Sequence, residues 1–181
     1  MTEALLTPNK WSRPQRKLSE VKAIVLHWYM HPGESARGAR EWWEMRKSGT
    51  SGFGSAHVAI DDRETLLCVP YDEMAYHVGA NTYTQFALEQ LSPYPNNCTI
   101  GVELAHADWT GKPSLDVWEK SVSVCIDLCR RFRIPPTMIV THFDVTGHQA
   151  KWGQYQCHQW FATQPGELAR FRAQVRGGFA A

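Results

Sequence analysis

Ala23-Ile24-Val25-Leu26-His27 is a short β-branched run that ends in a histidine, and it is the clearest indication of the fold. A second run, Met138-Ile139-Val140-Thr141-His142, ends in the same way. Such runs with sharp polar boundaries are typical of buried strands. A histidine just past the run lies at the rim of the sheet, where distant side chains converge. Two neutral imidazoles make half of a zinc site, so this pattern predicts a metal centre.

Strands and helices alternate outward from these two runs. Further strands are expected at residues 55–60, 65–69 and 100–105, the first two as a hairpin. Helices are expected at residues 35–45, 84–91, 114–132 and 165–175, with Ser35 and Ser114 as N-caps. We therefore expect one α/β domain over residues 1–181, with a central, mostly mixed sheet flanked by helices. The zinc site would lie at one edge or face of that sheet, residues 1–20 would form an irregular lead-in, and residues 176–181 a flexible tail.

The composition is that of an ordinary globular protein, with 43% hydrophobic and 20% charged residues. A net charge of +1 without a basic stripe argues against a nucleic-acid partner. The N-terminus lacks a charged start followed by an apolar stretch, and no run approaches the ~18 apolar residues that span a bilayer. We expect a monomer made in the cytoplasm without a signal peptide, with no membrane partner. The eight tryptophans are interpreted mainly as packing residues.

The cysteines are interpreted as reduced thiols, because there are five of them and no export signal. Cys125 and Cys129 lie on the apolar stripe of the predicted helix at 114–132, and Cys68 lies in a predicted strand. All three are expected to be buried as small hydrophobes.

A catalytic zinc keeps three protein ligands, so a third is expected near one of the two histidines. Four candidates follow His142 in the sequence: Asp144, His148, Cys157 and His158. Asp144 is expected to cap the turn at residues 144–147. Spacing alone leaves Cys157 slightly ahead of His148.

Several further blocks, in this order, carry a resemblance. They are Ser55-Ala56-His57, Ala75-Tyr76-His77-Val78-Gly79, the run Asn96-Asn97-Cys98-Thr99-Ile100-Gly101-Val102-Glu103-Leu104, and Thr141-His142-Phe143-Asp144-Val145-Thr146-Gly147. Together with the strand that ends at His27, the chain from about Trp11 to Arg172 resembles the zinc-dependent N-acetylmuramoyl-L-alanine amidases. More narrowly, it is similar to the catalytic domains of phage endolysins and bacterial autolysins.

The resemblance implies roles for named residues. His27 and His142 would be zinc ligands, and Cys157 the third, although Cys157-His158 stands where the family has Cys-Pro. The family lysine two places before that ligand is replaced by Tyr155. Lys151 or His148 would then assist the oxyanion.

Glu103 would face the zinc-bound water and act as the base. A lone strand glutamate is more often held in an ion pair, but an inward charge in an apolar strand is costly unless it has work to do. Tyr76, His57 and His77 would line the substrate groove, although single histidines at such places are more often structural.

The implied activity is zinc-dependent cleavage of the amide between N-acetylmuramic acid and L-alanine, with peptidoglycan as substrate. The enzyme would act on the bacterial wall after release from the cell. Two alternatives remain open: a recognition module of the same fold that binds muropeptide without cutting it, and a structural zinc protein with a closed four-ligand site.

Overall fold

The computed structural model describes residues 1–149, 153–164 and 166–180. Its strands are β1 (Thr2–Glu3), β2 (Ala23–Trp28), β3 (Val58–Ile60), β4 (Thr65–Leu67), β5 (Thr99–Leu104) and β6 (Ile139–Thr141). Its α-helices are α1 (Ala36–Met45), α2 (Gln85–Gln90), α3 (Leu115–Phe132), α4 (His142–Thr146), α5 (Gln159–Thr163) and α6 (Glu167–Ala180). Short 3-10 turns lie at η1 (Arg46–Ser48), η2 (Pro95–Asn97) and η3 (Pro136–Met138). The α/β architecture expected from the sequence is confirmed.

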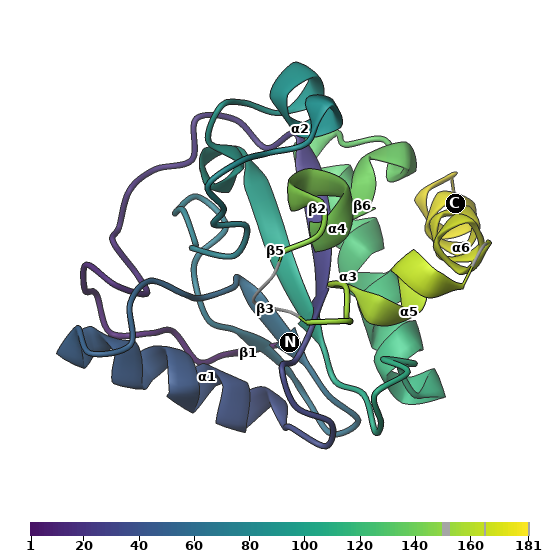
Figure 1. Ribbon diagram of the computed structural model, residues 1–181. Helices are drawn as coiled ribbons and strands as arrows, with labels where there is room; N and C mark the ends of the chain where they lie inside the picture. The colour runs from purple at the N-terminus through teal and green to yellow at the C-terminus, as the bar shows by residue number, and fades with distance from the viewer. Residues whose placement is uncertain (150–152, 165, 181) are drawn as a thin grey trace.

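The six strands form one mixed sheet in the order β1-β4-β3-β5-β2-β6. Strands β3, β5, β2 and β6 run parallel, whereas β4 is antiparallel to β3, as the predicted hairpin requires. The carboxyl ends of four strands therefore meet at the same edge of the sheet. Both histidine-terminated runs are among them, with β2 lying between β5 and β6 (Figure 1).

The two faces of the sheet are covered differently. Alternate residues of the central strands, such as Ile24 and Leu26, join a core with α3 and α6. The opposite face of β2, at Ala23 and Val25, packs against a smaller cluster from α2 and α4. Figure 1 shows α3 and α6 on one side of the sheet and α1 and α2 on the other. Because His27 follows Val25 by two residues, it projects from the face with the smaller cluster.

Helix α3 agrees with its sequence pattern. Ser114 caps it by accepting a hydrogen bond from the Val117 amide at 3.2 Å. Cys125 and Cys129 are fully buried in the core, and Cys68 is equally buried beside β4. Their interpretation as small hydrophobes is confirmed, since all three thiols are free.

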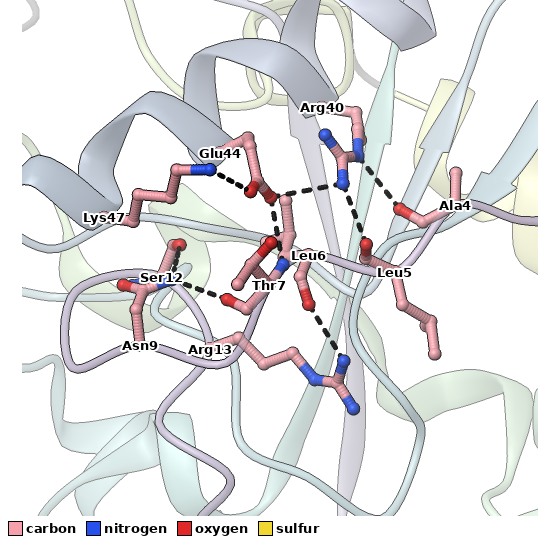
Figure 2. Close-up of polar contacts among 10 residues, drawn as sticks. All are labelled: Ala4, Leu5, Leu6, Thr7, Asn9, Ser12, Arg13, Arg40, Glu44 and Lys47. Atoms are coloured by element: carbon pink, nitrogen blue, oxygen red, sulfur yellow. Dashed lines mark hydrogen bonds and ion pairs between the residues drawn. The ribbon is translucent and has the colours of Figure 1, made fainter.

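The N-terminal segment, residues 1–20, is irregular apart from β1, and it is tied to the sheet and to α1. Strand β1 pairs in parallel with β4. Arg40 donates to the carbonyls of Ala4 and Leu5 at 3.1 and 2.8 Å, and Glu44 accepts from the Thr7 amide at 3.0 Å (Figure 2). These hydrogen bonds join residues 35–37 positions apart, so they leave no periodic signal in the sequence.

The C-terminal segment differs from the prediction. Helix α6 continues to Ala180, through most of the residues expected to form a tail. Gly178 is accommodated because its Cα lies against Ile126 of α3, where an added Cβ would approach Ile126 Cδ1 to 2.3 Å. Arg130 also donates to the Gly178 carbonyl at 2.6 Å. Contact with α3 stabilises this last turn, which the two adjacent glycines alone would disfavour. Within the described residues, no helix is long and apolar enough to cross a bilayer.

Candidate active site

The register of the sheet places two of the predicted site residues side by side. His27 on β2 lies directly opposite Glu103 on β5, and both side chains leave the same face. His27 is the fifth residue of β2 rather than a residue beyond its end. His142 follows β6, which flanks β2 on its other side.

His142 begins a helix instead of ending a strand. Thr141 accepts a hydrogen bond from the Asp144 amide at 3.1 Å, and Asp144 accepts in return from the Thr141 amide at 2.8 Å. This capping box starts α4 at His142 and fixes the backbone of the ligand. Asp144 therefore caps the start of a helix, which corrects its expected role in a turn at residues 144–147.

A cluster of possible metal ligands forms at this edge. The ligand atoms of His27, His142 and Cys157 all lie within 4.8 Å of one another, and all three residues are buried. Cys157 Sγ lies 3.6 Å from His27 Nδ1, and the rings of His27 and His142 have their centroids 4.8 Å apart. Two imidazoles and a thiol are a donor set suited to a borderline-soft cation, so this cluster can hold a metal ion.

The loop before α5 brings Cys157 to the histidines. The Phe143 amide donates to the Cys157 carbonyl, which joins this loop to the first turn of α4. His158 is fully buried against Phe161, with ring centroids 4.6 Å apart, and burial lowers its pKa to about 3. His148 is exposed beside His142. Among the described residues, the cluster contains Cys157 and neither of these two histidines.

Glu103 is a partly buried residue beside His27. Its Oε2 atom is inaccessible and has no hydrogen-bond partner within the described part of the chain. Burial raises the pKa of Glu103 to about 8 because the charged form loses its hydration. No ion pair of Glu103 is found among the described residues, so the ordinary ion-paired role does not apply.

The cluster and Glu103 open into one cavity of about 750 Å³. Its wall is rich in aromatic side chains, from α1, the loop after η1, and the segments around residues 76 and 94. Trp42 and Phe53 stand on this wall with 46% and 52% of their surface exposed. Phe53 contacts Tyr76 with ring centroids 4.9 Å apart. Arg46 lies 3.8 Å over the Trp42 ring and donates to the carbonyl of Phe53 at 3.2 Å, which positions the loop.

The other predicted site residues separate into three groups. Tyr76 and His77 line the cavity. His57 does not, because it is fully buried and both its ring nitrogens are bonded to backbone, to the Glu73 carbonyl at 2.9 Å and the Gly101 amide at 3.0 Å. Lys151 lies outside the described residues.

Sequence reasoning missed the aromatic wall and one buried histidine. Trp42 lies on the helix face next to the buried Trp43, and its neighbours in the sequence gave no reason to separate the two. Trp28 and Trp118 are buried as expected, whereas Trp109 is 46% exposed. That histidine is His106, which is buried with its nitrogens 2.7 Å from the carbonyls of Tyr29 and Asp108. An exposed aromatic can be recognised only once its helix is packed.

Residues 17–166 match the family model Amidase_2, described as N-acetylmuramoyl-L-alanine amidase. The chain belongs to this amidase family. It is 32% identical over 154 residues to the N-acetylmuramoyl-L-alanine amidase BlyA of Bacillus subtilis (strain 168), covering 80% of this chain and 40% of BlyA. It is 29% identical to a probable N-acetylmuramoyl-L-alanine amidase of Bacillus licheniformis, covering 92% of this chain and 44% of that protein. The chain thus spans less than half the length of these curated relatives.

Solved structures show the same fold. The PlyG catalytic domain superposes with a TM-score of 0.71 at 21% identity, covering 99% of this chain and 95% of that domain. PlyL superposes with a TM-score of 0.69 at 21% identity, covering 97% of this chain and 96% of that chain. Both structures agree with the single-domain α/β fold described above.

Proposed function

We propose that this protein is a zinc-dependent N-acetylmuramoyl-L-alanine amidase that cleaves the bond between N-acetylmuramic acid and the L-alanine of the stem peptide. The observation that carries the proposal is the convergence of His27, His142 and Cys157 in one cavity beside Glu103, whose Oε2 atom is inaccessible. Family membership makes amide hydrolysis of peptidoglycan the natural reaction for such a site.

Zinc fits the residues present. Two imidazoles and a thiol, held by β2, the start of α4 and one loop, are three ligands. A catalytic zinc keeps three protein ligands and one open position. When bound, zinc would act as a Lewis acid toward a carbonyl and make a water molecule more acidic. The cluster adjoins a cavity, as an open site requires, whereas a structural zinc would be enclosed by four ligands.

Glu103 would move the proton. A carboxyl group whose pKa lies near neutral can accept a proton from the attacking water and return it to the leaving amine. His27, which lies opposite Glu103 on the adjacent strand, is a ligand of the proposed zinc. The base and the cation would therefore act on the same water and carbonyl. We retain Lys151 and His148 as candidates to assist the oxyanion, because both belong to the segment between the second and third proposed ligands.

The aromatic wall would hold the substrate. Trp42 and Phe53 present flat apolar faces beside the cluster, and such faces suit the C–H surfaces of sugar rings. Tyr76 adds a hydroxyl on the same wall. We propose that the glycan side of peptidoglycan lies here and that the enzyme acts as a monomer on the bacterial wall after release from the cell.

One assay tests the proposal against its alternatives. Purified protein is added to peptidoglycan, and new N-terminal alanine is measured with and without a chelator. Release that stops with the chelator, while circular dichroism stays unchanged, is the expected result. Binding to peptidoglycan without release would favour a recognition module, and unfolding on chelation would favour structural zinc. The Glu103→Ala variant should bind zinc yet release no alanine, and full activity in that variant would refute the role of Glu103.

A further inference from the structure

His77 touches a proposed zinc ligand rather than pointing freely into the groove. Its Nδ1 atom lies 3.0 Å from His27 Nε2, and the two rings meet edge to face. His77 is buried, so most of its surface is unavailable to a substrate. The hydrogen bonds of His77 therefore determine whether it donates to His27 or accepts from it.

The far side of the His77 ring fixes where its hydrogen lies. Thr99 Oγ1 lies 2.7 Å from the Pro95 carbonyl, which only accepts, so the hydroxyl hydrogen is used there. The same oxygen lies 3.1 Å from His77 Nε2 and must accept from it. The Thr99 carbonyl, at 3.3 Å from Nε2, is a second acceptor. His77 Nε2 therefore carries the hydrogen.

The near side of the ring then follows. A buried imidazole is favoured in its neutral form, so His77 has one hydrogen and its Nδ1 accepts. The atom that donates to Nδ1 is His27 Nε2. His27 consequently carries its hydrogen on Nε2 and presents a lone pair at Nδ1, the atom that lies 3.6 Å from Cys157 Sγ.

We propose that His77 is a positioning residue that sets the tautomer and ring orientation of the zinc ligand His27. It does so as part of a hydrogen-bond chain that runs from the Pro95 carbonyl through the Thr99 hydroxyl and His77 to His27. This inference rests on the proposed function in so far as the cation is zinc. Metal-ligating histidines commonly donate their other N–H to a partner that raises their basicity. Here that partner is a second imidazole, itself fixed from behind.

The surroundings hold His77 in this one position. Asn96 Oδ1, which is buried, accepts from the amides of His77 and Val78 at 3.0 and 2.9 Å. Gly101 on β5 leaves the space for the ring, since an added Cβ there would lie 2.6 Å from His77 Cγ. A substrate-binding side chain needs no such enclosure, whereas a support for a ligand does.

The test compares His77→Phe, which removes the acceptor, with His77→Asn, whose side-chain oxygen can take the place of Nδ1. Zinc affinity is measured by competition with a chromogenic chelator. His77→Phe should bind zinc about 10- to 100-fold more weakly than the parent protein, and His77→Asn should recover most of that loss. Thr99→Val, which keeps His77 and the volume of the side chain, should weaken zinc binding about fivefold, and Thr99→Ser should bind like the parent protein.

A second readout needs neither zinc nor activity. In the metal-free protein, ¹⁵N NMR of the histidine rings should show the hydrogen of His27 on Nε2. A hydrogen on Nδ1 would overturn the inference, even if the protein proved to be an active amidase. Unaltered zinc affinity in folded His77→Phe and Thr99→Val would also overturn it, as would a raised KM alone, which would make His77 a substrate-binding residue. If His77→Phe does not fold, the two Thr99 variants decide. Failure of the parent protein to bind zinc would instead refute the proposed function.

Discussion

The free energy of unfolding of the metal-free Glu103→Gln variant, relative to that of the parent protein, should be higher at neutral pH than at acid pH. The unfolded chain releases this proton near the ordinary carboxyl pKa of 4.5, whereas burial raises the pKa of Glu103 in the folded protein to about 8. Between these values the folded state binds more protons than the unfolded state. Its stability therefore falls as pH rises from 4.5 and stops falling near pH 8.

The size of the effect follows from those two pKa values. Each pH unit between them costs about 1.4 kcal/mol, so from pH 5 to pH 7.5 Glu103 lowers the free energy of unfolding by about 3 kcal/mol. Gln has a similar shape and does not titrate. The difference in unfolding free energy between Glu103→Gln and the parent protein should therefore increase by about 3 kcal/mol over this range.

Urea unfolding at pH 5 and pH 7.5, with chelator present, measures this difference. Other buried groups, such as His57 with its pKa lowered to about 4, titrate equally in both proteins and cancel. Any fixed cost of the amide side chain is the same at both pH values and cancels as well. Parallel stability profiles for the two proteins would show that Glu103 is hydrated, and the argument for its neutral-range pKa would fail.

Three further predictions concern the ligands, the aromatic wall and the core. Cys157→Ser should lose nearly all bound zinc, measured by metal content, and His148→Ala should keep it; the reverse would make His148 the third ligand. Trp42→Ala should raise the KM for peptidoglycan about three- to tenfold, whereas the KM of Trp42→Phe should stay close to that of the parent protein. An equal fall in kcat for both variants would argue against a binding role for Trp42. Cys125→Ala should lower the free energy of unfolding by about 1–2 kcal/mol in urea while zinc content is unchanged, and loss of zinc would contradict its assignment as a core residue.

The sequence predicted the frame of the site because that frame is made of regular elements. His27 and His142 each follow a β-branched run. The two runs form β2 and β6, which pair in parallel, so the two histidines lie at the same edge of the sheet. The sequence placed Glu103 in a strand, and the register of the sheet sets this residue opposite His27. The sequence can indicate this arrangement because side chains alternate regularly between the two faces of a strand and paired strands lie at a fixed spacing.

The parts that could not be predicted depend on contacts between segments far apart in the chain. The role of His57 changed because its ring nitrogens are bonded to the backbone at residues 73 and 101, 16 and 44 residues away. Trp42 and Trp43 are adjacent in sequence, yet only Trp42 is exposed on the cavity. The local sequence around His57 does not show which distant residues will lie next to it. Only the packed structure therefore distinguishes a structural histidine from one that binds substrate.

Tyr155 shows how this chain departs from the pattern it resembles. The resemblance puts the family lysine at this position, whereas here the Tyr155 ring stacks on Trp109 with centroids 5.0 Å apart and planes 17° apart, and it also contacts Trp28. An aromatic side chain packed in this way fixes the loop that ends at Cys157, but it supplies no positive charge. The resemblance implies a positive charge near the oxyanion, so we propose that a residue other than Tyr155 supplies it in this chain.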